Sequence, residues 1–182
     1  YKLKLHEIYD AMPGQLDQKN KRFQLNSIRK GISYDRVAND FLWLKDAGVA
    51  LPVFCVEEPM VPLLLSKATN LFKLFLSDVG LLASMYMNDI QIKILNREKD
   101  INFGSIYENV AAQELKAHGF SLYYFNNKKQ GELDFVIERD GEVLPIEIKS
   151  GKDYSKHAAL NHVLKNPRYH ISEGYVFYNG NV

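Results

Sequence analysis

The chain has 182 residues, of which 46% are hydrophobic and 25% charged, a composition that excludes a disordered or fibrous protein. With 23 Lys and Arg residues against 22 Asp and Glu, the net charge is +1, so any binding of nucleic acid or anionic lipid must be local. The single cysteine excludes an internal disulfide and indicates a reducing compartment, so we expect a cytoplasmic protein.

The most apolar stretch, residues 63–87, is interrupted by charged side chains. Lys67, Lys73 and Asp78 fall within a length that a membrane helix would need free of charge, so we expect buried core and no membrane partner. The sequence starts at Tyr1 without a Met and stops at Val182 without an obvious end, so we expect part of a longer chain.

The first sixty residues predict short helices followed by a strand. An apolar stripe precedes Pro13-Gly14, which we expect to end the first helix. A short element is expected at residues 27–31, and Ser33 is expected to cap a third helix that ends before Gly48. Residues 49–56 then predict an extended strand. This order is typical of a winged-helix module, in which the third helix either reads DNA or packs against a partner. A basic cluster precedes that helix and has two readings, a solvated loop or a binding surface; it contains Lys19, Lys21, Arg22, Arg29 and Lys30.

The middle of the chain predicts a helix and then a boundary. Leu71, Phe72, Phe75 and Val79 recur at helical spacing, and residues 88–102 are polar. We therefore expect a mostly helical domain over residues 1–100 and a second domain over residues 101–182.

The second domain opens with a helix and a hairpin. Ser105 and Glu108 match a capping box, and a helix is expected to run to Gly119. A strand at residues 121–125 precedes two more, at residues 132–138 and 143–150, which Asp140-Gly141 joins in a type I′ turn.

The turn fixes which residues of the hairpin lie opposite one another. Leu133, Phe135 and Ile137 then face Ile148, Ile146 and Leu144, while Asp134 faces Glu147 on the other side, with Cβ atoms about 4.5–5.5 Å apart. Two carboxylates so placed repel each other. A raised pKa of one carboxyl group, a nearby cationic side chain or a bound divalent metal would reduce this repulsion. Lys149 shares their face and would supply the cation.

These residues resemble the PD-(D/E)XK nuclease superfamily, whose core runs helix, three strands, helix, strand. Glu108, Asp134 and Glu147-Ile148-Lys149 match its acidic and lysine positions, although Leu133 stands where the naming motif has proline. Residues 154–165 and 174–178 would supply the last helix and strand. The expected fold is therefore an α/β chain with an αβββαβ nuclease-like core preceded by a winged-helix-like domain.

A longer resemblance covers nearly the whole chain. The runs Phe72-Lys73-Leu74, Asp78-Val79-Gly80-Leu81-Leu82, Tyr107-Glu108-Asn109, Gly131 to Val136 and Pro145 to Ser150 look like the C-terminal region of bacterial and archaeal AAA-type ATPases. In those proteins an ATPase module precedes a winged-helix-like segment and a nuclease-like domain. No phosphate-binding Gly-x-x-x-x-Gly-Lys loop occurs here, so ATP would bind only an upstream ATPase domain of the same chain.

The resemblance implies a candidate deoxyribonuclease that uses Mg²⁺ or Mn²⁺ and has DNA as its partner. Asp134 and Glu147 would bind the metal with the carbonyl of Ile148, Lys149 would be the catalytic lysine, and Glu108 would be a further catalytic and metal-binding acid. The lysines expected to hold phosphates beside the site are Lys128, Lys129, Lys152 and Lys156.

Each of these assignments has a plainer alternative. The acidic pair would be ordinary exposed hairpin positions, Glu108 only a helix cap, and the four lysines ordinary surface residues. Glu132 would pair with Lys149 across the strands. The whole region would then be a non-catalytic module that binds nucleic acid or a partner for the ATPase.

Overall fold

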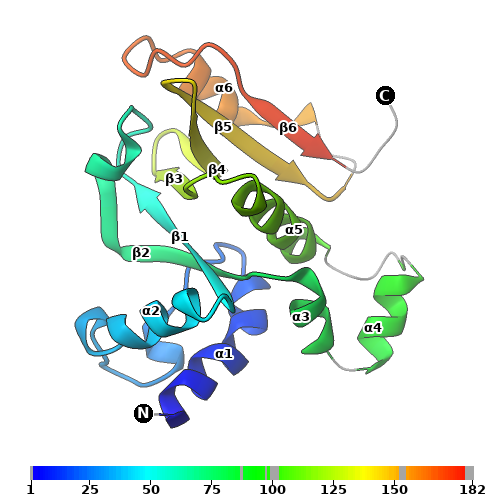
Figure 1. Cartoon of the computed structure of the whole chain (residues 1–182). Coiled ribbons are helices and arrows are strands. Elements are labelled where there is room, and N and C mark those ends of the chain that lie inside the picture. The colour runs from blue at the N-terminus through cyan, green and yellow to red at the C-terminus, as the bar shows by residue number, and fades with distance from the viewer. Residues whose placement is uncertain (1, 87, 97, 99–102, 152–154, 179–182) are drawn as a thin grey trace. The chain divides into compact units, whose positions relative to one another are not determined.

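A computed structural model describes residues 2–86, 88–96, 98, 103–151 and 155–178 (Figure 1). The chain divides into two compact units: Tyr1–Pro52 with Asn70–Gln113, and Val53–Thr69 with Glu114–Val182. The predicted boundary near residue 100 stays a prediction. None of the helices in the described ranges has the length and apolar character needed to cross a lipid bilayer.

The fold is a mixed α/β arrangement with one six-stranded sheet of order β2-β1-β3-β4-β5-β6. Its strands are β1 (Ala50–Val56), β2 (Lys67–Leu76), β3 (Tyr123–Asn127), β4 (Gly131–Arg139), β5 (Glu142–Lys149) and β6 (Tyr175–Tyr178). The pairs β1–β3 and β5–β6 are parallel, whereas β3–β4 and β4–β5 are antiparallel. The described helices are α1 (Lys2–Leu16), α2 (Ala38–Asp46), α3 (Val79–Ser84), α4 (Asn88–Leu95), α5 (Gly104–Ala117) and α6 (Ala158–Leu164).

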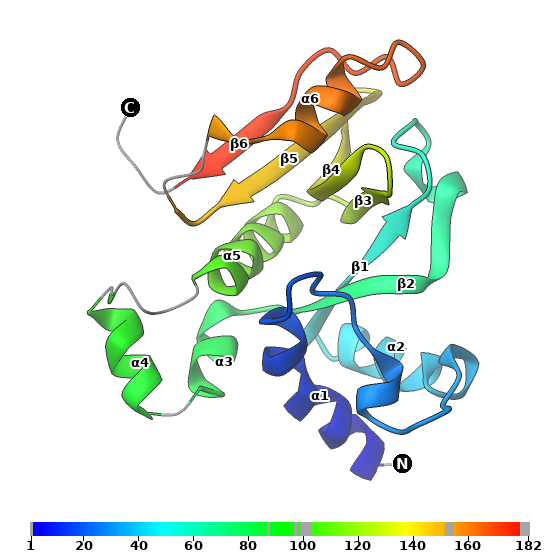
Figure 2. The ribbon, with the colours of Figure 1, turned by 180° about the vertical axis from the view of Figure 1, so that it is seen from behind.

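In the first unit α1 lies beside α2 (Figure 2), and an aromatic cluster joins α2 to other segments of the unit. Phe41 meets Phe23 and Phe72 edge to face, with ring centroids 5.3 and 4.9 Å apart, the geometry that the ring quadrupole favours. Ile8 and Met12 of α1 are fully buried. The apolar stripe of the first predicted helix is therefore a core face.

Three local expectations for this unit are wrong. Helix α1 continues through Pro13 to Leu16, the short element is a 3₁₀ turn at Leu25–Ser27 (η1), and Ser33 makes no side-chain capping bond. Instead Ser33 precedes a second 3₁₀ turn, Tyr34–Arg36 (η2), and α2 begins only at Ala38. The described order of helix, two 3₁₀ turns, helix and strand therefore does not establish a winged helix.

The helix expected through Leu71, Phe72 and Phe75 is also wrong, because these residues lie in β2. The five residues from Phe72 to Leu76 are all buried, which a strand covered on both faces produces. A short, mostly apolar run of this kind suits a buried helix and a buried strand equally, and the spacing of Phe72 and Phe75 fits a helix, so periodicity alone could not separate them.

Asn109 ties β2 to α5 within the first unit. Its side-chain oxygen accepts the backbone N–H of Leu76 at 2.8 Å, and its side-chain nitrogen donates to the Leu76 carbonyl at 3.0 Å. Asn109 is fully buried. One amide thus satisfies both backbone groups of a buried strand residue, where an unpaired group would cost free energy.

The second unit contains the predicted hairpin. Its pairs run from Arg139–Glu142 to Phe135–Ile146, and Asp140 and Gly141 both have positive φ, at 55° and 81°. The type I′ turn and the register are therefore confirmed over these pairs. The described order α5, β3, β4, β5, α6, β6 is also the predicted one, while its assignment to the nuclease superfamily stays a prediction.

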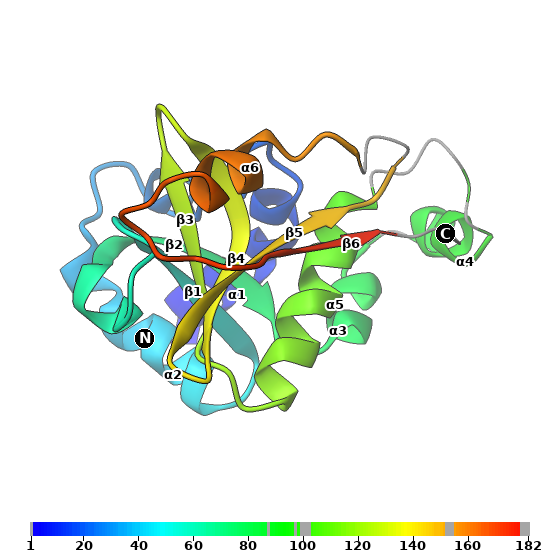
Figure 3. The same cartoon turned by 90° about the horizontal axis from the view of Figure 1, so that it is seen from above.

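Helix α6 contacts β4 and β5, and it lies close to β4 in the view from above (Figure 3). Its Leu160 and Val163 belong to a buried apolar cluster that also contains Val136 and Val143 of the hairpin. Gly131, at φ +96°, permits this close packing, because a Cβ there would lie 2.9 Å from that of Ala159. The first turn of α6 is thereby fixed against the strand ends that carry the candidate acids.

Replacing Asn109 with Ala should lower the free energy of unfolding by about 2–4 kcal/mol, because two buried backbone groups of Leu76 would lose their partners. Urea unfolding followed by circular dichroism would measure the change. The exposed Lys116 on the same helix provides the control, and Lys116→Ala should change stability by less than about 0.5 kcal/mol. Equal effects of the two substitutions would contradict this role.

Candidate functional site

Asp134 lies at the point where the β4–β5 residue pairs end. The last pair is Phe135–Ile146, so Asp134 and Glu147 are the next residues along their strands. The Asp134 Oδ2 atom accepts the backbone N–H of Ile148 at 2.8 Å. A carboxylate therefore takes up a backbone donor of β5, and Asp134 is held directly against the Glu147-Ile148 segment.

Glu147 is only 3% exposed and has a partner for each carboxylate oxygen. Oε1 accepts the backbone N–H of Leu160, in the first turn of α6, at 3.2 Å. Oε2 lies 2.8 Å from the Lys149 ammonium, whose side chain is 28% exposed. Glu147 and Lys149 thus share a face of β5, as their spacing of two predicts.

These contacts explain how the carboxylate is tolerated inside the fold. Burying an isolated carboxylate costs several kcal/mol, roughly, unless hydrogen bonds and an opposite charge compensate. Leu160 supplies the hydrogen bond and Lys149 the charge. Of the possible ways to reduce the repulsion between Asp134 and Glu147, the structure shows one: the ammonium of Lys149 lies against Glu147.

The donor set suits a hard divalent cation. In the described residues, no three His, Cys, Asp or Glu side chains are grouped closely enough to hold a metal. Mg²⁺ does not require such a cage, because it usually keeps several waters and takes one or two carboxylates together with substrate phosphate. Asp134 and Glu147 fit that pattern, and the Ile148 carbonyl stays a predicted ligand.

Glu108 belongs to the first unit and has a structural explanation of its own. It is 5% exposed, and its oxygens lie 2.8 Å from the Lys21 ammonium and 3.6 Å from that of Lys73. The capping box is wrong, because α5 begins at Gly104 and Ser105 lies inside the helix. A metal-binding or catalytic role of Glu108 stays a prediction.

The predicted phosphate-binding lysines have different positions. Lys128 and Lys129 are exposed in the turn between β3 and β4, and Lys156 is exposed just before α6. Lys152 lies outside the described residues. Their binding of phosphate stays a prediction.

The expected pair of Glu132 with Lys149 does not form in the described residues. Glu132 accepts a hydrogen bond from the side-chain amide of Asn126, and Lys149 contacts Glu147 instead. Glu147 lies on the same strand as Lys149, two residues away, and its Oε2 atom contacts the ammonium. Lys149 is thus placed at the acidic pair.

Sequence reasoning missed two contributors to this region. The backbone N–H of Leu160 carries no side-chain pattern, so only the packing of α6 reveals its bond to Glu147. Tyr178 lies beside Lys149 because β6 pairs with β5 in parallel, with Lys149 opposite Tyr178. The strand was expected, but its neighbour and register could not be read from a four-residue element.

Two family models match the chain. A domain of unknown function, DUF8612, matches residues 2–93, half of the chain, so the chain belongs to that family. A second domain of unknown function, DUF4143, matches residues 103–182 and is typically found at the C-termini of AAA-ATPase-like proteins. No curated protein and no solved structure matches the chain.

Two substitutions of Glu147 should distinguish the contributions of its two contacts to stability. Glu147→Ala leaves the buried Leu160 N–H without its acceptor and should lower the free energy of unfolding by about 2–3 kcal/mol. Glu147→Gln keeps an acceptor and loses only the charge opposite Lys149, so a smaller loss of about 1 kcal/mol is expected. Thermal and urea unfolding would measure both.

Glu114→Ala, at an exposed acid of α5, is the control and should be nearly neutral. If Glu147→Ala were as well tolerated as Glu114→Ala, Glu147 would not be the buried, bonded carboxylate described above.

Proposed function

We propose that Asp134, Glu147 and Lys149 form a metal-dependent site for phosphodiester hydrolysis of DNA, in the C-terminal region of an AAA-type ATPase. The observation that carries the proposal is the grouping of two carboxylates and an ammonium at the adjoining ends of β4 and β5. Asp134 is bound to the Ile148 N–H, and Lys149 lies 2.8 Å from Glu147. The match to a domain typically found at the C-termini of AAA-ATPase-like proteins supports the proposed position of this site in such a protein.

Asp134 and Glu147 would hold the metal through carboxylate oxygens, since hard cations prefer oxygen ligands. Bound Mg²⁺ or Mn²⁺ would polarise a phosphoryl oxygen and lower the pKa of an attacking water. The contacts to Ile148 and Leu160 keep the two carboxylates in place before substrate arrives. Such preorganisation is a main source of catalytic electrostatic stabilisation.

Lys149 would stabilise the negative charge that develops on the phosphate. A lysine ammonium has three N–H donors, and the contact with Glu147 uses one of them. The other two would orient the water and contact a phosphate oxygen. Its partial exposure leaves the ammonium accessible to a substrate.

DNA would be held by lysines on the same unit. Lys128 and Lys129 lie in an exposed turn, and Lys156 precedes the helix that bonds Glu147. Lysine contacts to phosphate are independent of sequence and supply affinity rather than recognition. We therefore propose binding with little sequence preference.

A second candidate is a non-catalytic module that binds nucleic acid or a partner for the ATPase. The specific observation in its favour is that both oxygens of Glu147 already have protein partners. A carboxylate satisfied in this way does not need a metal. The two candidates make opposite predictions for cleavage.

Cleavage of plasmid and single-stranded DNA in Mg²⁺ and Mn²⁺ separates them. Asp134→Asn and Lys149→Met should each reduce the rate by about a hundredfold or more, because each removes a group that acts on the reacting phosphate. Chelation of the metal should abolish cleavage. Product formation over time, resolved on gels, is the measurement.

Lys165→Ala, at an exposed lysine that follows α6, is the matched control and should cleave at the parent rate. Binding of DNA without cleavage by any variant would favour the second candidate. Cleavage that survives Asp134→Asn would place the activity elsewhere and contradict the proposal.

A further inference from the structure

A small pocket in the first unit gathers cationic side chains from separate segments. It has a volume of about 160 Å³ and is lined by Lys4, Arg29, Lys30, Gly31, Ile32 and Arg36. Lys4 comes from α1, Arg36 ends η2, and the other four form the turn after η1. Four of the six lining residues are therefore positively charged, and none is acidic.

These four cations lack carboxylate partners. In the part of the chain that the structure describes, no side-chain hydrogen bond or ion pair involves Lys4, Arg29, Lys30 or Arg36. Glu7 and Asp35 are close to them in sequence, yet neither forms an ion pair with them. The pocket thus concentrates positive charge in a chain whose net charge is only +1.

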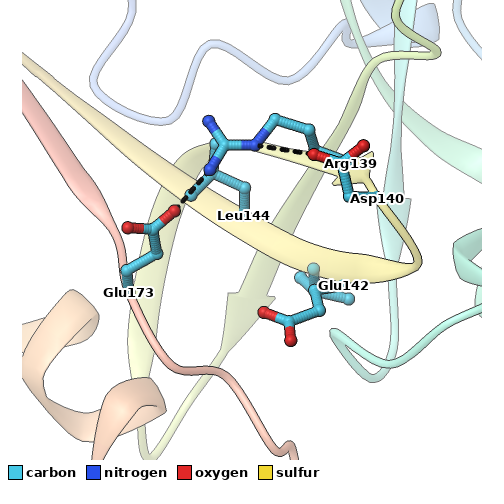
Figure 4. A pocket seen from close by; sticks show the side chains of 6 residues that line it. Arg139, Asp140, Glu142, Leu144 and Glu173 are labelled. Carbon is cyan, nitrogen blue, oxygen red and sulfur yellow. Dashed lines mark hydrogen bonds and ion pairs between the residues drawn. The ribbon is translucent and has the colours of Figure 1, made fainter.

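A second pocket of similar size shows the contrast. It has a volume of about 170 Å³ and lies at the turn end of the β4–β5 hairpin (Figure 4). Its cation, Arg139, pairs with Glu173 and lies 3.8 Å from Asp140 (Figure 4). The cation of that pocket is paired within a lining that also holds three acids, whereas the lining of the first-unit pocket has four cations and no acid.

The turn that carries Arg29 and Lys30 is held by its own hydrogen bonds. Gly31 has φ +76°, and its N–H donates to the Asn26 side chain at 3.2 Å. The Ile32 N–H donates to the Arg29 carbonyl, also at 3.2 Å. The charges are therefore presented by a fixed backbone, which lowers the entropy cost of binding a ligand.

The size and charge of the pocket select its ligand. Sites for whole drug-sized ligands typically have volumes of about 300–1,000 Å³, so this pocket suits one small group. Arginine forks match the oxygens of phosphate in pairs, and a phosphate monoester carries close to two negative charges at neutral pH.

We propose that Lys4, Arg29, Lys30 and Arg36 form a binding site for one phosphate group. The phosphate comes either from a small phosphorylated compound or from the backbone of a nucleic acid. The site is separate from the acidic pair of the second unit and does not rest on the proposed hydrolysis.

Titration with inorganic phosphate, followed by backbone amide NMR in a phosphate-free buffer, tests the site. Saturable shifts are expected at Gly31 and Ile32, and Arg29→Gln and Arg36→Gln should each weaken the affinity by about tenfold or more. Arg29→Lys, which keeps the charge and loses the fork, should weaken it less. Unchanged amide spectra away from the pocket would establish that each variant is folded.

Lys45→Gln is the matched control, since Lys45 is an exposed cation of the same unit outside the pocket, and it should bind phosphate as the parent does. Displacement of phosphate by a single-stranded oligonucleotide without a terminal phosphate would identify a nucleic-acid backbone, and lack of displacement a small compound. Absence of saturable shifts at Gly31 and Ile32, or equal weakening by Lys45→Gln, would overturn the proposal. Asp134→Asn should leave this binding unchanged.

Discussion

The buried carboxylate of Glu147 is the constraint on which the candidate site depends. It is nearly inaccessible to water, so it needs both the Lys149 ammonium and the Leu160 N–H to be stable in the fold. The first of these contacts requires the spacing of two residues along β5. The second requires α6 to lie against the hairpin, which the absence of a side chain at Gly131 permits.

The same principle organises the first unit. Glu108 is buried between Lys21 and Lys73, and Lys73 itself is only 1% exposed. In each unit a buried acid is compensated by lysine. The residues of the basic cluster recognised in the sequence therefore have different roles. Lys21 forms an ion pair with the buried Glu108, while Arg29 and Lys30 line the phosphate pocket that we propose.

The hairpin could be predicted from sequence because its determinants are local. Asp140-Gly141 demands a turn with two positive φ angles, and alternating apolar residues then fix the register. The contact between Lys149 and Glu147 follows from the same alternation. Strand β2 could not be predicted, because the short apolar run at its buried end has no alternation that distinguishes it from a helix. The bonds from Asn109 to Leu76 and from Leu160 to Glu147 depend on tertiary packing and leave no local pattern.

The central claim is that Asp134 and Glu147 bind a divalent metal, and Mn²⁺ binding followed by electron paramagnetic resonance tests it most directly. The account predicts saturable binding of Mn²⁺ to the parent chain that Asp134→Asn abolishes and Glu114→Ala preserves, with Mg²⁺ competing for the site. Absence of saturable binding, or the same binding by the parent and by Asp134→Asn, would contradict the account.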